Sequence, residues 1–183
     1  MTNIIINEYA LKKQAFFLHN YMENLNFKHF VENEFMSDVE KTVAKIPKSH
    51  KDLIKDYKFK SESGNTLGGK GKHVGEIDEK KKHIKVAAPY NYSREFTILH
   101  EISHAVWKYK MTDQLKKEWN TLVKNTKKEQ KDKDDKTKDA KDSLDQNAEE
   151  IFCMVYSNVY SKHPTTTYDH DAWKNFILSR VPA

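Results

Sequence analysis

The segment from Ser93 to Tyr109, SREFTILHEISHAVWKY, contains the motif that decides how this sequence is interpreted. Most of its positions are apolar, Ser93 suits a helix N-cap, and Glu95 would lie in the first turn. The sequence therefore predicts a buried α-helix over residues 93–109. His100 and His104 are four residues apart in this helix, which places both imidazoles on one face, about one turn apart.

Two histidines at this spacing match two corners of a zinc tetrahedron, with ring nitrogens as ligands. Glu101, between them in the motif HExxH, is placed to act as a general base on a metal-bound water. Buried polar groups without compensation are costly, so two histidines and a glutamate inside an apolar helix need a reason. We therefore predict a zinc centre with His100 and His104 as ligands and Glu101 as the catalytic residue.

A third protein ligand is expected from a later helix. The segment NAEEIFCMVYSNVY predicts an apolar helix over residues 148–160, and its first turn carries Glu149 and Glu150. On a helical wheel Glu149 lies among Phe152, Cys153 and Tyr156, which favours Glu149 as the ligand. Glu150 lies at the polar edge of the same helix and remains the other candidate.

The whole chain has 183 residues, of which 37% are hydrophobic and 32% charged, with a net charge of +5. These proportions suit one soluble domain with a core, and no apolar run approaches the roughly 18 residues of a membrane helix. Cys153 is the only cysteine, which excludes an internal disulfide framework. The positive charge is spread among acids, and Arg94 and Arg180 are the only arginines, so we expect no nucleic acid partner and no membrane contact.

The expected fold is α+β, with a small, mostly antiparallel sheet, the HExxH helix packed on it, and helices at both ends. We expect one domain over residues 1–183, composed of a helical part at 1–46 and a catalytic core at 47–183. Residues 124–142 are nearly all Lys, Asp and Glu, and are read as a charged insertion. Helices are also expected near 49–55, 111–123 and 173–178. Strands are expected near 57–60, 74–77 and 83–88, the last two as a hairpin.

Several segments together resemble the zinc metallopeptidases related to anthrax lethal factor and the secreted Pro-Pro endopeptidases. The resemblance covers residues 39–183 and rests on AKIP at 44–47, LGG at 67–69, ILHEISHAV at 98–106 and NAEEIFCMVY at 147–156. It implies a zincin-like fold, one Zn²⁺ per chain, and Glu150 as the third ligand. Two positions depart from the family pattern. Met154 stands where the family has a second glutamate, and Ser143 stands where it has a tyrosine thought to stabilise the oxyanion.

The resemblance also implies how a peptide substrate binds. In such peptidases the strand before the active-site helix is an exposed edge, so we expect residues 83–88 to pair with an extended peptide. The loop near residues 67–71 and a nearby tyrosine would form the side-chain pockets. The expected substrate-binding residues are Leu67, Gly68, Gly69, His83, Val86 and Tyr90.

The function predicted from these residues is that of a zinc-dependent endopeptidase acting on a protein or peptide as a monomer. One alternative is an intracellular regulatory HExxH peptidase that cleaves a repressor, in which Asp145 would enter the metal site. Another is a catalytically silent zinc-binding protein, and a basic nucleic-acid module is a third. The N-terminal segment MTNIIINEYALKK has no basic region or cleavage site of a signal peptide. We therefore expect a cytoplasmic or phage-encoded protein, or a secreted one lacking its leader.

Overall fold

The computed structural model describes residues 32–62, 75–87, 93–133 and 147–183. The chain divides into two compact units, Met1–Ser37 and Asp38–Ala183. Of the first unit only residues 32–37 are described, and these are helical. All elements discussed below belong to the second unit, in which residues 38–43 are helical as well.

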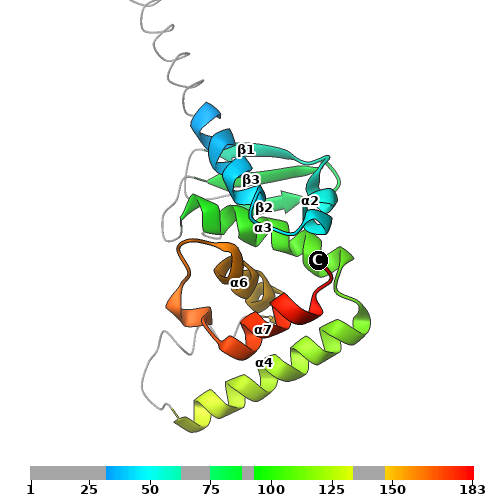
Figure 1. The fold of residues 1–183 in the computed structure, drawn as a ribbon, viewed down its shortest axis with the longest axis vertical. Helices are drawn as coiled ribbons and strands as arrows, with labels where there is room; N and C mark the ends of the chain where they lie inside the picture. Colours follow the sequence, from blue (N-terminus) through cyan, green and yellow to red (C-terminus); the bar gives the residue numbers. More distant parts are fainter. Residues whose placement is uncertain (1–31, 63–74, 88–92, 134–146) are drawn as a thin grey trace, which may run out of the picture. The chain divides into compact units, whose positions relative to one another are not determined.

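A mixed sheet of three strands forms one layer of this unit (Figure 1). Its strands are β1 (Lys58–Glu62), β2 (Gly75–Asp78) and β3 (His83–Ala87), in the order β1-β3-β2. β2 and β3 form the predicted antiparallel hairpin, whereas β1 runs parallel to β3. The expectation of a mostly antiparallel sheet is therefore wrong, because one of the two strand pairings is parallel.

β3 lies in the centre of the sheet, and the expectation that residues 83–88 form an exposed edge is also wrong. Ile84 and Val86 are buried, whereas the side chains of β1 and β2 are exposed or half-buried. The strand with the strongest apolar alternation takes the position with a neighbour on each side, where burial is greatest. Within the described residues, β1 and β2 are the edge strands of this sheet.

The predicted HExxH helix is present as α3 (Arg94–Tyr109). The Ser93 side chain accepts a hydrogen bond from the backbone N–H of Phe96 at 3.1 Å, as expected of an N-cap. Glu95, in the first turn, accepts from Lys45 Nζ at 2.5 Å and from the backbone N–H of Lys162 at 2.7 Å. These contacts fix the start of the helix, so the positions of the histidines further along it are well defined.

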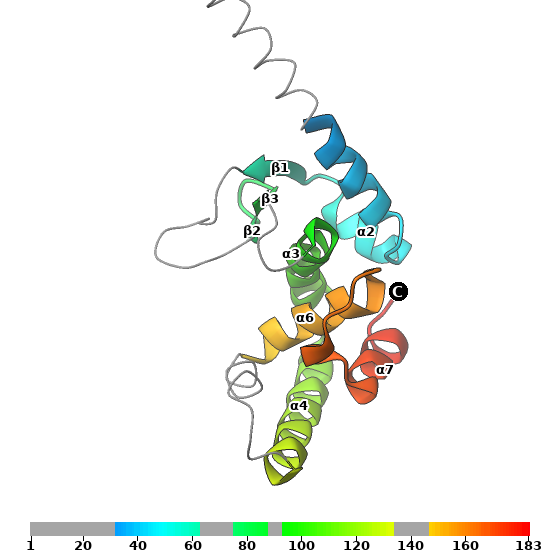
Figure 2. The same cartoon turned by 90° about the vertical axis from the view of Figure 1, so that its left-hand side faces the viewer.

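α3 is enclosed by other elements on several sides. Figures 1 and 2 show it between the sheet and α6 (Ala148–Tyr160), and its contacts with β2, β3 and α6 agree with this arrangement. The short helix α2 (Lys48–Ile54) also packs against α3. Because both sides of α3 are covered, an apolar helix with only a few polar positions is stable there.

The remaining helices support α6 from its other side. α7 (Asp171–Arg180) packs on α6, and α4 (Asp113–Lys133) packs on both of them. The 3₁₀ turn Thr166–Tyr168 lies between α6 and α7 in the chain. Trp119 of α4 donates its indole N–H to the carbonyl oxygen of Ala148 at 2.8 Å. The aromatic rings that join these helices belong to Trp119, Phe152, Trp173 and Phe176.

The described part of the chain is thus α+β, as expected. α4 extends beyond the predicted end at residue 123, to Lys133, so part of the charged run is helical. The predicted helix over 148–160 matches α6, and the expected C-terminal helix is slightly longer than predicted. None of the described helices is long and apolar enough to cross a membrane.

Candidate metal centre

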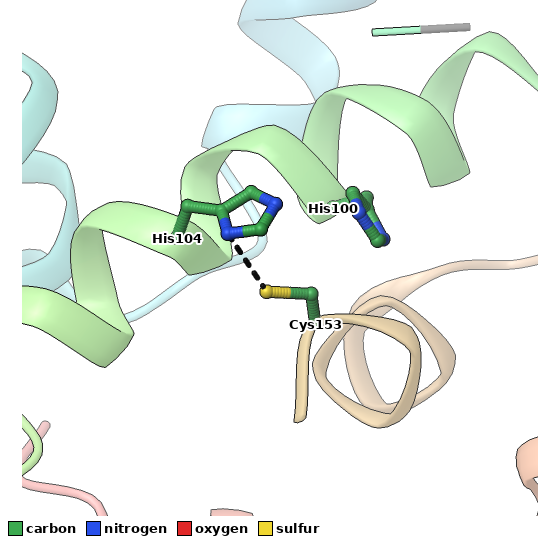
Figure 3. Close-up of side chains that lie close together, drawn as sticks. All are labelled: His100, His104 and Cys153. Atoms are coloured by element: carbon green, nitrogen blue, oxygen red, sulfur yellow. Dashed lines mark hydrogen bonds between the residues drawn. The ribbon is translucent and has the colours of Figure 1, made fainter. Parts of the chain in front are cut away.

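His100 and His104 lie on the face of α3 that is turned toward α6 (Figure 3). Their ring centroids are 5.1 Å apart and the rings are nearly perpendicular, at 79°. Both side chains are mostly buried, with 17% and 18% of their surface exposed. The spacing of four residues thus produces the paired imidazoles expected from the sequence, in a place where water has restricted access.

Cys153, from α6, faces the same two histidines. Its Sγ lies 3.5 Å from His104 Nδ1, and ligand atoms of the three residues all lie within 4.8 Å of one another (Figure 3). His100, His104 and Cys153 are therefore close enough together to hold a metal ion. Cys153 was not predicted as a ligand, although its place one turn after Glu149 and Glu150 on the same helix was a signal.

The thiol of Cys153 is fully buried, and burial disfavours its charged form. Burial raises its pKa well above the usual value, and the nearby carboxylates of Glu150, Glu149 and Glu101 raise it further. A hydrogen bond with Ser103 opposes the shift only in part. Without a metal, burial therefore favours the protonated thiol, whereas a bound metal ion would favour the thiolate.

Glu149 and Glu150 both reach the histidines from the first turn of α6. Oε2 of Glu150 lies 3.3 Å from His100 Nε2, and its Oε1 lies 3.8 Å from His104 Nε2. Glu149 instead approaches the other nitrogen of His104, with Oε1 at 2.9 Å from Nδ1. The Asn147 side chain accepts a hydrogen bond from the Glu150 backbone N–H at 2.9 Å and so fixes this turn.

Glu101 is buried beside the histidines, with 5% of its surface exposed. Burial, and next the charges of Glu150 and Glu76, raise the pKa of its carboxyl to about 8. The side chain packs against Gly75 at the start of β2, where an added Cβ would lie only 2.3 Å from Glu101 Oε1. Glycine at this position therefore makes room for the Glu101 carboxyl group.

A cavity of about 620 Å³ brings these groups to one place. β2, α3, α4 and α6 each contribute to its wall, which contains five carboxyl groups and two lysines. Lys108 pairs with Glu79 and Lys85 pairs with Glu76, so two of these acids have a cationic partner. The lining residues are Gly75, Glu76, Ile77, Glu79, His100, Glu101, His104, Trp107, Lys108, Lys116, Glu149 and Glu150.

The contribution of β2 to this cavity was missed from the sequence. Gly75 is the last of the five glycines between residues 64 and 75, and that position was its only signal. Glu76 and Glu79 belong to the predicted hairpin, but their proximity to Glu101 depends on how the sheet packs on α3.

The predicted substrate-binding residues of β3 do not offer a free edge. His83 pairs with Lys58 on one side and Asp78 on the other, and Val86 pairs with Ser61 and Gly75. Val86 is also 1% exposed and faces the core. The remaining candidates, Leu67, Gly68, Gly69 and Tyr90, lie outside the described residues, as do Ser143 and Asp145.

No family model, no curated protein and no solved structure matches this chain. The functional interpretation therefore depends on the motifs of the chain itself and on the geometry of the site.

Proposed function

We propose that this chain is a zinc-dependent endopeptidase in which His100, His104 and Glu150 hold the metal. The observation that carries the proposal is the arrangement of three side chains around one point. The Nε2 atoms of both histidines face the two oxygens of a single carboxylate, at 3.3 and 3.8 Å. Glu101 lines the same cavity, where a general base is required.

These distances fit the size of a zinc ion. Zinc binds histidine nitrogen and carboxylate oxygen at about 2.0–2.2 Å, so two such ligands in a tetrahedron are about 3.4 Å apart. The separations between Glu150 and the two Nε2 atoms are close to that value. Two imidazoles with one carboxylate are also a ligand set that leaves a fourth position for water in zinc peptidases.

Cys153 is the rival third ligand, because ligand atoms of His100, His104 and Cys153 all lie within 4.8 Å of one another. Its position speaks against it, since its sulfur lies beside His104 Nδ1, the nitrogen that already has Glu149 as a partner. Glu150 faces the other nitrogen and is therefore the better third ligand.

Zinc in this position would supply a Lewis acid, which makes water a nucleophile at neutral pH and polarises the peptide carbonyl. The charge of zinc would favour the ionised form of Glu101, which would then accept the proton of the attacking water and deliver it to the leaving amine. Its burial against Gly75 restricts the carboxyl group to one region of the cavity, and such positioning is a large part of catalysis.

The substrate in this proposal is an extended peptide that pairs with β2 rather than with β3. β2 is an edge strand of the described sheet, and Gly75, Glu76 and Ile77 line the cavity that contains Glu101. Backbone pairing with a sheet edge places a peptide bond with little dependence on sequence.

The test combines metal analysis with a peptide-library cleavage assay, with and without chelator. We expect about one zinc per chain, lost in His100→Ala and Glu150→Ala, and cleavage that stops with chelator. Glu101→Gln should keep zinc and abolish cleavage, because an amide cannot act as a base. Glu79→Gln, which removes a charge from the same cavity, should keep zinc.

Three results would contradict the proposal. Zinc binding without cleavage of any library peptide would favour the silent zinc-binding protein. Loss of zinc in Asp145→Ala but not in Glu150→Ala would favour the ligand set of the regulatory peptidase. An active Glu101→Gln variant would show that another group is the base.

A further inference from the structure

We infer that Glu149 is a positioning residue for the metal centre: it holds His104 in the tautomer that directs Nε2 toward the metal. This inference rests on the proposed function, because it assumes that His104 binds the metal through Nε2. It gives the two adjacent glutamates of α6 different roles, Glu150 as a ligand and Glu149 as the partner of a ligand.

The tautomer follows from the chemistry of the contact. Oε1 of Glu149 lies 2.9 Å from His104 Nδ1, within hydrogen-bond distance. A carboxylate can only accept, so the hydrogen must be on Nδ1. In a neutral imidazole the other nitrogen then has the free lone pair, which is the form that binds a metal.

The position of Nε2 makes this tautomer useful. Nε2 of His104 faces Glu150 Oε1 at 3.8 Å, and the other oxygen of Glu150 lies 3.3 Å from His100 Nε2. The lone pair set free by Glu149 is therefore directed to the same region as the His100 and Glu150 donor atoms. Hydrogen bonds from the second nitrogen of a ligating histidine commonly orient the ring and strengthen it as a ligand.

Cys153 is the competing partner of His104 Nδ1, at 3.5 Å. Cysteine sulfur is a weak acceptor and its S–H a weak donor, so Cys153 selects a tautomer less strongly than a carboxylate does. Without Glu149, the described neighbourhood of Nδ1 retains this sulfur as its partner. We therefore expect His104 to populate both tautomers once the carboxylate is removed.

The Glu149 side chain should also contribute little to folding stability. Its side chain is 40% exposed, and an ion pair in contact with solvent adds little to folding stability. The start of α6 is held independently, by the Asn147 cap and by Trp119 on the Ala148 carbonyl. A Glu149 variant should therefore fold normally, which makes its effect on His104 measurable.

The first experiment observes the tautomer directly in the full chain. Long-range ¹H–¹⁵N correlation spectra of metal-free protein, above the histidine pKa, distinguish which ring nitrogen carries the hydrogen. We expect Nδ1–H at His104 in the wild type and in Glu149→Gln, whose amide oxygen still accepts. Glu149→Ala should show a mixture. Nε2–H in the wild type, or an unchanged tautomer in Glu149→Ala, would overturn the inference.

The second experiment measures zinc affinity with a competing chelator. Loss of such a partner commonly weakens metal binding by about 10–100-fold, and we expect this for Glu149→Ala. Glu149→Gln should recover most of the affinity, and Glu79→Gln, a charge control from the same cavity, should match the wild type. Equal losses in Glu149→Gln and Glu149→Ala would overturn the role of the hydrogen bond, as would an unchanged affinity in Glu149→Ala.

These readouts separate the inference from the proposed function. The tautomer is measured without metal or substrate, and zinc affinity is measured without hydrolysis. If the wild type has Nδ1–H at His104 and binds zinc but cleaves no peptide, only the peptidase proposal is refuted. Cleavage that persists with a wild-type tautomer in Glu149→Ala would refute the inference alone.

Discussion

Gly75→Ala is a small substitution with a large expected effect on Glu101. The added Cβ would lie 2.3 Å from Glu101 Oε1 and 2.7 Å from its Cδ, where contacts under 3.0 Å are essentially never seen. The Oε1 contact alone therefore requires a shift of at least about 0.7 Å (3.0 minus 2.3). The backbone of Gly75 is outside the left-handed region, so alanine is strained there only by this overlap.

The carboxyl group can move into the adjacent cavity, so the cost should fall on catalysis rather than on folding. A displacement of about 1 Å at a reacting group can reduce the rate by about 100-fold. Replacing glycine where the backbone permits it stabilises by about 0.4–1 kcal/mol, which offsets part of the overlap. We expect cleavage to fall by about 100-fold while the unfolding free energy changes by no more than about 1 kcal/mol.

The assay compares peptide cleavage, zinc content and urea unfolding for Gly75→Ala and two reference variants. Glu101→Gln defines the complete loss of the base. Asp78→Ala changes the same strand at a residue outside the cavity wall, so it should leave cleavage near the wild-type rate. Wild-type cleavage by Gly75→Ala would refute the reasoning, because it would show that Glu101 is not the base or does not lie against Gly75.

Three further predictions test the surroundings of the site. Cys153→Ala should bind zinc within about threefold of the wild type, and a loss of about 100-fold in a metal titration would identify the cysteine as a ligand. Trp119→Phe should reduce the unfolding free energy by about 1–3 kcal/mol in urea, because the Ala148 carbonyl loses its donor; an unchanged value would contradict this. Burial lowers the pKa of His50 below 6.5 in the folded chain, so as the pH falls this histidine becomes protonated in the unfolded chain before it does in the folded one. Stability should therefore fall as the pH drops below about 6.5, and this slope should be smaller in His50→Gln; equal slopes would argue against His50 as its source.

The elements of the fold were largely predictable from local sequence. Ser93 before an apolar segment predicted the start of α3, and the alternation around Ile84 predicted β3. The order of the strands was not predictable, because it depends on which strand packs best against α3. The weakly apolar β1 pairs with β3 in parallel, an arrangement that no local signal indicated.

The site was predictable only as far as it lies within one helix. Because His100 and His104 are four residues apart in one helix, they lie on the same face of it independently of how the rest of the chain packs. The contacts of Glu149, Glu150 and Cys153 depend on the rotation of α6 against α3, which the sequence does not encode locally. Gly75 is the clearest example, because its importance comes from a side chain that is remote in the sequence.

A helical wheel alone cannot decide whether Glu149 or Glu150 is the metal ligand. The wheel indicates which residue faces the packed side of α6, and it favoured Glu149 because that side includes Cys153. A metal ligand must instead face the same nitrogen atoms that face the other ligands. Glu149 lies near Nδ1 of His104, whereas Glu150 lies near Nε2 of both histidines, and the proposed ligand set rests on the second arrangement. In the proposed centre, Glu149 on the packed side orients the histidine, and Glu150 at the polar edge binds the metal.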